Sequence, residues 1–453
     1  MALFKKKHEK KEKPKKIGMI SLGCPKNQVD GELMLDKLQE AGYIIQNDVA
    51  GCDAVIVNTC GFIEAAKKEA IENVLDVAGY KSDGEVSKLV VTGCLSERYQ
   101  GEIREEIPEV DAVVGIGADA DIVSVMDRVF AGEEVEEFPD KEQLPLEGER
   151  LLTTPDSWAY LKIGEGCSNN CAFCAIPSIR GRFRSRPIES ITAEAKALAV
   201  RGVKEIILIA QDTSLYGKDL YGELKLPELL RQLAKIDGIH WIRFLYTYPE
   251  RITDELLEVM KTEPKVVHYL DIPLQHADAG VLKRMHRVGS RESFTALIEK
   301  IRREIPDICL RTTVMTGFPG ETDEAFENLA EFVKEMKFDN LGCFVFSPEE
   351  GTAAAEMEDQ VEDEVKTHRQ ELIMQMQHDI AAEKNRACVG KTLEVVVEGY
   401  NKYDDVFVGR SYRSVPEIDG LVFFTGEKEM QPGDFVDVDI FDVDEYDLRG
   451  ETF

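Results

Sequence analysis

The sequence lacks two features that would place it among membrane or secreted proteins. No apolar run approaches the roughly 20 residues that a membrane span requires, although 43% of the 453 residues are hydrophobic. The first 16 residues are rich in lysine and contain no apolar stretch of the kind that a secretory leader needs. We therefore expect a soluble, cytoplasmic protein. Residues 1–16 are expected to form a basic disordered tail or, alternatively, a charge-driven docking arm.

Positive charge is scarce as well. The chain has 55 Lys and Arg against 86 Asp and Glu, a net charge of −31. Nucleic-acid binding draws most of its affinity from basic side chains that neutralise phosphates, so nucleic acid is not expected as the main partner. An acidic surface instead attracts a basic protein or peptide. The simpler alternative is that the acidity only keeps the protein in solution.

The ten cysteines indicate metal binding or catalysis rather than disulfides, because the cytosol keeps thiols reduced. Cys167, Cys171 and Cys174 form a CxxxCxxC stretch. Iron–sulfur clusters are held by thiolates, and three ligands leave one iron of a four-iron cluster open to another molecule. Zinc is disfavoured because it usually needs four ligands, and the nearest downstream histidine is His240. A chance trio of structural cysteines is the remaining alternative.

The first part of the chain alternates apolar runs with helical patterns. Residues 17–138 therefore predict an α/β domain with an open parallel sheet. Cys24, Cys60 and Cys94 each follow a predicted strand, and the carboxyl ends of parallel strands face one crevice. We expect these three thiols to converge there and bind a second cluster. Cysteines that are merely buried as small hydrophobic residues are the alternative.

A second α/β domain and a β-barrel follow. Residues 139–155 are acidic and contain prolines, which is typical of a linker. Residues 156–384 predict six strands with helices between them, a partial (β/α)6 TIM-like barrel with its chemistry at the C-terminal mouth. Residues 385–453 predict a small antiparallel, OB-like β-barrel. From residue 384 onward there are 8 Lys and Arg against 16 Asp and Glu, the wrong sign for gripping RNA.

These stretches resemble a known enzyme family. The CxxxCxxC pattern, with the aromatic Phe173 before its last cysteine, resembles the signature of the radical S-adenosylmethionine (SAM) superfamily. Residues 21–27, 58–63 and 92–95, which surround the first three cysteines, resemble the N-terminal domain of the methylthiotransferases in that superfamily. The terminal barrel resembles their TRAM domain. The resemblance spans residues 17 to 453.

The resemblance implies two 4Fe–4S clusters and SAM as cofactors. In the family, a first SAM methylates a sulfur on the auxiliary cluster. A second SAM, bound at the open iron of the radical SAM cluster, is cleaved to a 5′-deoxyadenosyl radical. That radical removes hydrogen from the substrate carbon, which then takes up the methylthio group. An ionic base cannot do this because the C–H bond is too weakly acidic. The implied ligands are Cys24, Cys60 and Cys94 for the auxiliary cluster and Cys167, Cys171 and Cys174 for the radical SAM cluster.

Within the family, the sequence favours the branch that modifies the β-carbon of an aspartate in the basic ribosomal protein S-twelve. The branch that modifies tRNA adenosine typically has Cys-Gln-Met-Asn at its first cysteine, where this chain has Cys24-Pro25-Lys26-Asn27, and a more basic terminal barrel. A departure is Gly31, where serine is more usual. A non-catalytic iron–sulfur assembly protein is a further alternative. The favouring stretches are 24–30, 174–181, 211–214, 246–249 and 269–276.

Further cofactor contacts are expected at the predicted strand ends. Helix capping is the alternative role for Asp212 and Thr213, which follow the second barrel strand. An ordinary turn is the alternative for Gly317 and Gly320, which follow the fifth barrel strand. An electron donor is also required. The residues expected to contact SAM or substrate are Phe173, Gln211, Asp212, Thr213, Gly317 and Gly320.

Other polar and cysteine residues are less specific. The arginines at alternate positions from Arg180 to Arg186 predict either a positive rim for a carboxylate or a solvated strand face. The residues expected to be structural are Cys52, Cys309, Cys343, Cys388, His268 and His276.

Overall fold

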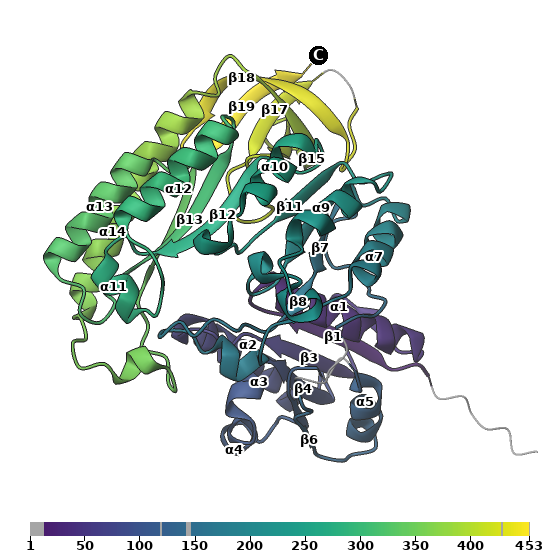
Figure 1. Cartoon of the computed structure of the whole chain (residues 1–453). Coiled ribbons are helices and arrows are strands. Elements are labelled where there is room, and N and C mark those ends of the chain that lie inside the picture. The colour runs from purple at the N-terminus through teal and green to yellow at the C-terminus, as the bar shows by residue number, and fades with distance from the viewer. Residues whose placement is uncertain (1–12, 118–119, 142–145, 427–428, 453) are drawn as a thin grey trace, which may run out of the picture. The chain divides into compact units, whose positions relative to one another are not determined.

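The computed structural model describes residues 13–117, 120–141, 146–426 and 429–452 (Figure 1). Most of the predicted basic tail, residues 1–12, lies outside the described residues. The chain divides into two compact units, Met1–Leu151 and Leu152–Phe453. The division falls inside the predicted linker, and the finer domain boundaries stay a prediction. Across the described residues, no helix has both the length and the apolar character to cross a bilayer.

Unit 1 (Met1–Leu151) is built on one six-stranded sheet of order β2-β1-β3-β4-β5-β6, in which all neighbours are parallel. This is the open parallel α/β sheet that the sequence predicts. The strands are β1 (Lys16–Ser21), β2 (Ile44–Gln46), β3 (Ala54–Thr59), β4 (Lys88–Gly93), β5 (Ala112–Val114) and β6 (Val135–Glu137). The helices are α1 (Pro25–Glu40), α2 (Glu64–Ser82), α3 (Cys94–Tyr99), α4 (Glu102–Glu106) and α5 (Ile122–Phe130).

Helices cover both faces of this sheet. Val57 of β3 packs with Val74 of α2 on one face, whereas Ile56 packs with Leu38 of α1 and Met126 of α5 on the other. Successive strand residues point to opposite faces, so a strand covered on both sides must be apolar throughout. Every residue of β3 is accordingly buried. The strand ends, not the strand faces, are therefore left for chemistry.

Unit 2 (Leu152–Phe453) begins with six parallel strands in chain order, arranged as two sheets of three strands, β11-β10-β7 and β12-β13-β14. The predicted partial barrel is confirmed. A two-stranded antiparallel sheet of β8 (Gly164–Glu165) and β9 (Arg184–Ser185) stands apart from it. The barrel strands are β7 (Trp158–Lys162), β10 (Glu205–Ile209), β11 (Trp241–Phe244), β12 (Tyr269–Gln275), β13 (Cys309–Thr316) and β14 (Asn340–Val345).

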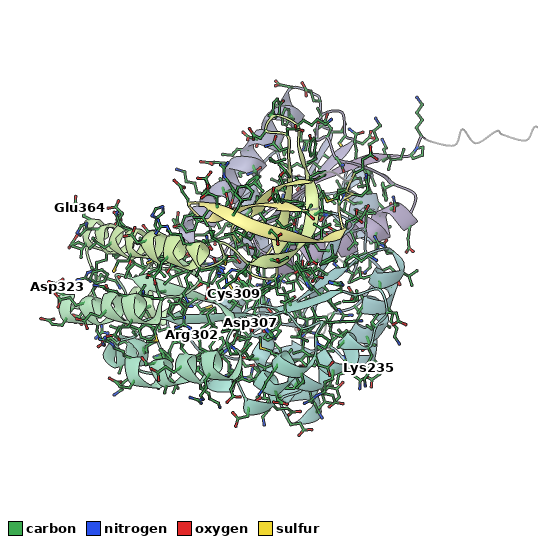
Figure 2. The ribbon with its side chains drawn as sticks, turned by 90° about the horizontal axis from the view of Figure 1, so that it is seen from above. Lys235, Arg302, Asp307, Cys309, Asp323 and Glu364 are labelled. Atoms are coloured by element: carbon green, nitrogen blue, oxygen red, sulfur yellow. The ribbon has the colours of Figure 1, made fainter. Side chains whose placement is uncertain are left out.

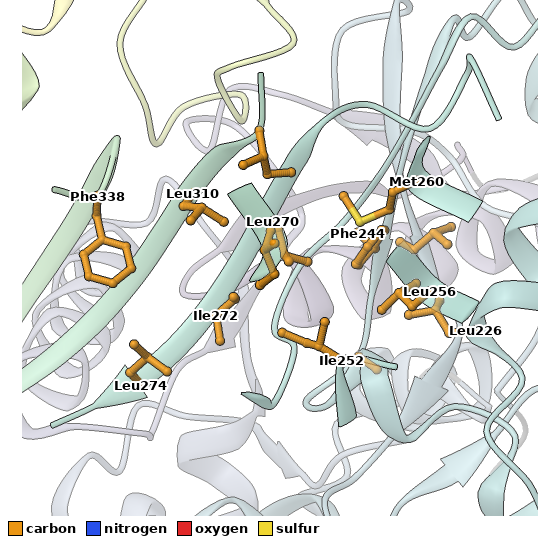
Figure 3. Packing of buried hydrophobic residues seen from close by; sticks show 14 of the residues in the cluster. Leu226, Phe244, Ile252, Leu256, Met260, Leu270, Ile272, Leu274, Leu310 and Phe338 are labelled. Atoms are coloured by element: carbon orange, nitrogen blue, oxygen red, sulfur yellow. The ribbon is translucent and has the colours of Figure 1, made fainter. Parts of the chain in front are cut away.

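The core of unit 2 lies between these strands and the surrounding helices. Figure 3 shows Leu270 and Ile272 of β12 beside Leu310 of β13, with Phe244 of β11 and Met260 of α10 nearby, and all five are buried. Burying one such side chain contributes about 1.5–3 kcal/mol. The unit 2 helices are α6 (Ile176–Arg180), α7 (Ile188–Val200), α8 (Lys218–Tyr221), α9 (Leu226–Ala234), α10 (Asp254–Thr262), α11 (Ala279–Arg284), α12 (Arg291–Glu304), α13 (Asp323–Met336) and α14 (Asp363–Arg386).

A closed barrel of order β15-β16-β17-β19-β18 ends the chain, as the sequence predicts. Four of its five strand pairs are antiparallel, but β17 pairs with β19 in parallel. The purely antiparallel expectation is therefore wrong at this one seam. The strands are β15 (Thr392–Asn401), β16 (Val406–Ser411), β17 (Val422–Gly426), β18 (Phe435–Asp444) and β19 (Asp447–Thr452).

The terminal barrel contacts the N-terminal ends of the strands of the partial barrel. Glu205, the first residue of β10, pairs with Arg243 at 2.9 Å and with Arg410 of β16 at 2.8 Å, and all three are fully buried. Burial alone would raise the pKa of Glu205, but the two arginines hold it below its ordinary value. The Cys309 thiol at the start of β13, labelled in Figure 2, donates to the Arg413 carbonyl. The strand ends at the opposite side stay clear of these contacts.

Candidate functional site

The first three cysteines follow three adjacent strands of unit 1. Cys24 follows β1 and is the N-cap residue of α1, Cys60 follows β3, and Cys94 follows β4 as the first residue of α3. Because β1, β3 and β4 are neighbours in a parallel sheet, all three thiols lie at the same edge. Cys60 and Cys94 are buried and Cys24 is partly exposed.

Two glycines allow the three loops to touch. A Cβ on Gly23 would lie 2.7 Å from the Cβ and 3.0 Å from the Sγ of Cys60. A Cβ on Gly61 would lie 2.8 Å from both the backbone nitrogen and the Cα of Leu95. The loop before Cys24 therefore rests on Cys60, and the residue after Cys60 rests on the backbone next to Cys94. The absence of side chains at both positions brings the three cysteine loops against one another.

A side-chain amide fastens two of these loops. The Nδ2 of Asn27 donates to the carbonyls of Leu22, Asn58 and Thr59, at 2.7, 3.3 and 3.3 Å. Asn58 returns a hydrogen bond from its own amide to the Asn27 carbonyl at 2.7 Å. Buried polar groups are stabilising only when they are paired in this way. The Asn27 amide thus holds the ends of β1 and β3 in register around the thiols.

Two of these cysteines begin helices. Cys24 and Cys94 stand at the N-terminal ends of α1 and α3, where backbone N–H groups favour a nearby negative charge. Three thiols are a suitable donor set for an iron–sulfur cluster. In the described ranges, no group of three or more His, Cys, Asp or Glu has the arrangement of a single metal ion site. Cluster ligands surround a larger body of iron and sulfide, so they stand farther apart than the ligands of one ion.

The CxxxCxxC loop of unit 2 follows β7 and β8. Gly166 has a φ of 79°, and a Cβ there would collide with the Arg182 carbonyl. This close approach lets the backbone N–H of Cys167 donate to the Gly181 carbonyl at 3.0 Å. A second anchor is the N–H of Ala172, which donates to the Met285 carbonyl at 3.0 Å. The loop is therefore fixed on two sides before any ligand binds.

The three thiols of this loop lie close enough to interact electrostatically. Burial raises the pKa of Cys167 and raises that of Cys174 to about 12, and each feels the charge of the neighbouring cysteines. The Cys174 thiol is therefore protonated at neutral pH when no metal is bound, and it would have to lose this proton to become a metal ligand.

Cys171 has two polar partners. The hydroxyl of Tyr248 lies 3.4 Å from its Sγ, and the guanidinium of Arg287 lies 3.9 Å from the same atom. The Arg287 guanidinium also stacks on the Tyr248 ring, 4.2 Å from its centroid, and donates to the Pro273 carbonyl at 2.7 Å. A positively charged side chain and a hydroxyl group therefore stand beside this sulfur.

A second network joins the cysteine loop to the strand ends. The amide of Asn169 donates to Asp212 Oδ2 at 2.7 Å and also reaches the Cys167 Sγ at 3.5 Å. Arg251 pairs with the same Asp212 oxygen and donates to Asn169 Oδ1 at 2.9 Å. Asp212 is fully buried. The loop is thus tied to the residues that follow β10 and β11.

A buried carboxylate occupies the base of the site. Glu165 pairs with Arg180 at 3.0 Å and Lys162 at 3.1 Å, and accepts from the Gln211 amide at 2.6 Å. Burial alone would raise the Glu165 pKa, but Arg180 and Lys162 hold it well below its ordinary value. The Gln211 Oε1 atom is buried and has no hydrogen-bond partner among the described residues. This acceptor is available to a donor on a ligand.

The other predicted contacts stand at strand ends, with protein neighbours of their own. Asp212 caps the short helix Thr213–Leu215, and the Thr213 hydroxyl donates to the Leu245 carbonyl at 2.5 Å. A Cβ on Gly317 would collide with Lys366, and one on Gly320 would lie 2.6 Å from the Arg284 guanidinium. Internal packing accounts for both glycines. Phe173 stacks edge-on against Phe318 at 6.4 Å. The roles of these residues toward SAM stay predictions.

The arginine series does not form one exposed rim. Arg180 and Arg186 are buried in ion pairs with Glu165 and Glu194, whereas Arg182 is exposed. Of the residues expected to be structural, His268 bonds to Asp307 and to the Met260 carbonyl. The buried ones are Cys52, Cys309, Cys343, Cys388 and His276.

Sequence reasoning did not assign roles to several residues around the cysteine loop. Asn169 lies within the CxxxCxxC stretch and Tyr248 within residues 246–249, so their positions in the sequence indicate that they lie near the site. Arg287 comes from the segment after α11, and Arg251 follows Tyr248 in a short helix. No local pattern marks either arginine, because each reaches the site only through the barrel fold.

Three segments of the chain match models of known protein families. Residues 161–333 match the Radical SAM superfamily, residues 16–115 match the Uncharacterized protein family UPF0004, and residues 389–452 match the TRAM domain. Among solved structures, TsrM from Kitasatospora setae, a radical S-adenosylmethionine methyltransferase, has a TM-score of 0.57 at 13% identity over 83% of this chain and 77% of that chain. OxsB, a cobalamin-dependent S-adenosylmethionine radical enzyme, has a TM-score of 0.51 at 13% identity over 81% of this chain and 58% of that chain. These two likenesses concern the fold alone.

Curated relatives are much closer in sequence. The ribosomal protein uS12 methylthiotransferase RimO of Lachnoclostridium phytofermentans is 49% identical over 96% of this chain and 99% of the relative. The protein of the same name from Caldanaerobacter subterraneus subsp. tengcongensis is 50% identical over 96% of this chain and 99% of the relative. Identity at this level extends over nearly the full length of the chain, so it includes both compact units described above. The chain belongs to the RimO family of radical SAM methylthiotransferases.

Proposed function

We propose that this chain transfers a methylthio group to the β-carbon of an aspartate in ribosomal protein uS12, the S-twelve protein of the small subunit. The observation that carries this proposal is the 49–50% identity to ribosomal protein uS12 methylthiotransferases over 96% of the chain. Shared fold alone would not be enough, because one fold supports many reactions. The net charge of −31 also suits a basic protein substrate better than a nucleic acid.

The cofactors of this family are SAM and two 4Fe–4S clusters. We assign the auxiliary cluster to the three cysteines of unit 1, supported by the glycine contacts that press their loops together. We assign the radical SAM cluster to the three cysteines of the CxxxCxxC loop, supported by their mutual electrostatic interaction and the fixed loop backbone. The proposed ligands are Cys24, Cys60 and Cys94 for the first and Cys167, Cys171 and Cys174 for the second.

When bound, the clusters and SAM supply the electron, the radical and the sulfur, and the residues of the chain supply placement. Asn169, Asp212 and Arg251 form the network that orients the CxxxCxxC loop. The unpaired Gln211 Oε1 is an acceptor for an ammonium or hydroxyl donor of a ligand at the strand ends. Its own amide is held by Glu165, so the acceptor oxygen has a fixed direction.

The remaining parts of the proposal concern partners and location. An external electron donor must reduce the radical SAM cluster. The acidic terminal barrel is proposed to attract uS12 from a distance, because the chain has a net charge of −8 from residue 384 onward. Its contacts are with the strand starts, so it would act on parts of uS12 away from the reacting aspartate. A ribosomal-protein substrate supports a cytoplasmic location for the enzyme.

The direct test uses anaerobically reconstituted enzyme with SAM, a reductant and purified uS12. We expect uS12 to gain the mass of one methylthio group in place of hydrogen, located on an aspartate by tandem mass spectrometry. A parallel reaction offers isopentenylated tRNA. Modification of the tRNA with uS12 left unchanged would contradict the assigned substrate, and failure to form 5′-deoxyadenosine from SAM would contradict radical chemistry altogether.

A further inference from the structure

Unit 1 carries an open groove that the cluster chemistry does not use. It encloses about 490 Å³ and is lined by side chains of α2, α3 and α4, which Figure 1 labels in the purple and blue part of the chain. All of its lining residues belong to unit 1. The groove is therefore a property of this unit by itself.

The floor and one wall of the groove are apolar. Val74, Leu95 and Ile103 are buried beneath it. Ile71 and Leu75, one helical turn apart on α2, are 42% and 51% exposed on the wall. Large aliphatic side chains left in water next to an apolar floor are typical of a surface that a partner covers. The pair at positions i and i+4 offers one continuous stripe.

The rim of the groove is acidic. Glu102 and Glu106 stand four residues apart on α4, are exposed, and make no ion pair with other described residues. Lys67, the one cation among the lining residues, is already held by Glu64 at 2.7 Å and lies 5.9 Å from the Tyr99 ring centroid. The charge offered to a partner is therefore negative. A complementary partner presents apolar side chains flanked by Lys or Arg.

The groove adjoins the proposed auxiliary cluster site. Leu95 on its floor directly follows Cys94. Glu64 on its rim begins the helix that follows the Cys60 loop. Arg98 of α3 donates to the Gly61 carbonyl at 3.0 Å and so ties this wall to that loop. A protein chain seated in the groove is held beside the place where the methylthio group would be delivered.

We propose that this groove docks a basic amphipathic segment of uS12, separate from the segment that carries the reacting aspartate. The inference rests on the proposed function and names the docking surface for that substrate. Apolar side chains of the segment enter between α2 and α4, and its Lys and Arg side chains face Glu102 and Glu106. Remote binding of this kind is used to place the reacting group. An acidic redox protein would be repelled at the same rim.

Two double variants of the reconstituted full-length enzyme test the proposal. Glu102→Lys with Glu106→Lys reverses the rim, and Ile71→Ser with Leu75→Ser removes the apolar stripe. Each is expected to raise KM for intact uS12 by about tenfold, the effect of losing roughly 1.4 kcal/mol of binding free energy. The kcat at saturation, the iron content and SAM cleavage without substrate should stay at wild-type levels. Turnover of a short peptide with the target aspartate should also be unchanged.

Matched controls use residues that do not line the groove. Glu105→Lys with Glu109→Lys makes the same charge change in the same segment. Tyr80→Ser removes a 43% exposed side chain from the same helix. Both controls should leave KM for uS12 within about twofold of wild type, as surface changes usually do.

The outcomes separate this inference from the proposed function. An unchanged KM in both groove variants, with uS12 still methylthiolated, overturns the groove and leaves the function intact. An equal loss with the short peptide, or a loss seen only with a protein reductant and not with dithionite, also overturns it. Wild-type enzyme that modifies neither uS12 nor the peptide contradicts the proposed function instead.

Discussion

The hydroxyl of Tyr248 lies 3.4 Å from the Sγ atom of Cys171. Arg287 stacks on the ring of Tyr248 and reaches the same sulfur at 3.9 Å. A hydrogen bond and a positive charge at a ligand sulfur favour the more negative, reduced state of a cluster and so raise its reduction potential. The pair therefore stands where it can set the potential of the proposed radical SAM cluster.

Replacement of Arg287 by Met should lower that potential. Loss of a charged hydrogen bond of about 1.4 kcal/mol corresponds to roughly 60 mV in a one-electron couple. Tyr248→Phe, which removes only the hydroxyl, should give a smaller shift in the same direction. Redox titration followed by electron paramagnetic resonance measures both. Arg287→Lys retains the charge and should recover part of the loss. Identical potentials in all four proteins would show that the pair has only a packing role.

Serine at positions 24, 60 and 94 should remove one cluster and spare the other. We expect the bound iron and sulfide to fall to about half of the wild-type content, since one of two four-iron clusters is lost. Cleavage of SAM to 5′-deoxyadenosine should persist, whereas methylthiolated uS12 should disappear. Cys52→Ser is the matched control, because Cys52 is buried elsewhere in unit 1 with its thiol on the Asp48 carbonyl. Full iron content in the triple variant would refute the assignment.

Gly61→Ala tests the contact between two cysteine loops. The added Cβ would lie 2.8 Å from the backbone of Leu95, which cannot give way as a flexible side chain does. We expect unit 1 to lose its cluster and the iron content to drop by about half, with SAM cleavage retained. Gly79→Ala, in α2 with no atom within 4 Å of the new Cβ, should keep full iron. Iron analysis of the two variants side by side decides between them.

Glu205→Gln should destabilise unit 2 strongly. It leaves Arg243 and Arg410 buried without their shared carboxylate, a change that typically costs about 3–5 kcal/mol. The pKa of Glu205 is held below its ordinary value, so its stabilising effect is fully present at neutral pH. That effect is lost only as the pH falls below about 4 toward the folded-state pKa. The difference between wild type and variant should therefore shrink in acid.

Urea unfolding of the reconstituted proteins, followed by tryptophan fluorescence, measures this difference. Trp241 is a suitable reporter because it stands two residues before Arg243 on β11 and packs edge-on against Phe435 of the terminal barrel. Glu258→Gln is the control, because Glu258 is exposed on α10 and its change should stay within about 0.5 kcal/mol. Equal midpoints for Glu205→Gln and wild type at neutral pH would contradict the role given to the buried pair.

The order of strands and helices could be predicted because each barrel strand is an apolar run between helical patterns. Five strands that lack such a run were not predicted, and β8 and β9, with two residues each, are the shortest of them. β2 and β6 are only three residues long and partly exposed, and β19 alternates polar residues through most of its length. Such strands are defined by their neighbours in the sheet rather than by their own residues. The parallel seam between β17 and β19 is likewise a property of closure, which no local pattern reports.

The cysteines could be placed at strand ends from the sequence, but their surroundings could not. Spacing along the chain locates Cys171, whereas the approach of Arg287 depends on how the segment after α11 folds back. The same holds for Arg180, which reads as an exposed residue in an alternating series but is buried against Glu165. A charged side chain is buried in a core only where a group of opposite charge pairs with it. The tertiary fold brings that group into place, so the local sequence does not reveal it.

The contacts of the terminal barrel around Glu205 limit what can be learned from a truncated chain. A protein that stops before β15 would still contain Glu205, Arg243 and the first residues of β12 and β13, now opened to water where the Arg410–Asp419 segment had covered them. Any loss of activity in such a truncation would mix damage to the catalytic scaffold with loss of the acidic surface. Point substitutions on the outer face of the terminal barrel leave these contacts in place. They therefore isolate the contribution of the acidic surface to activity.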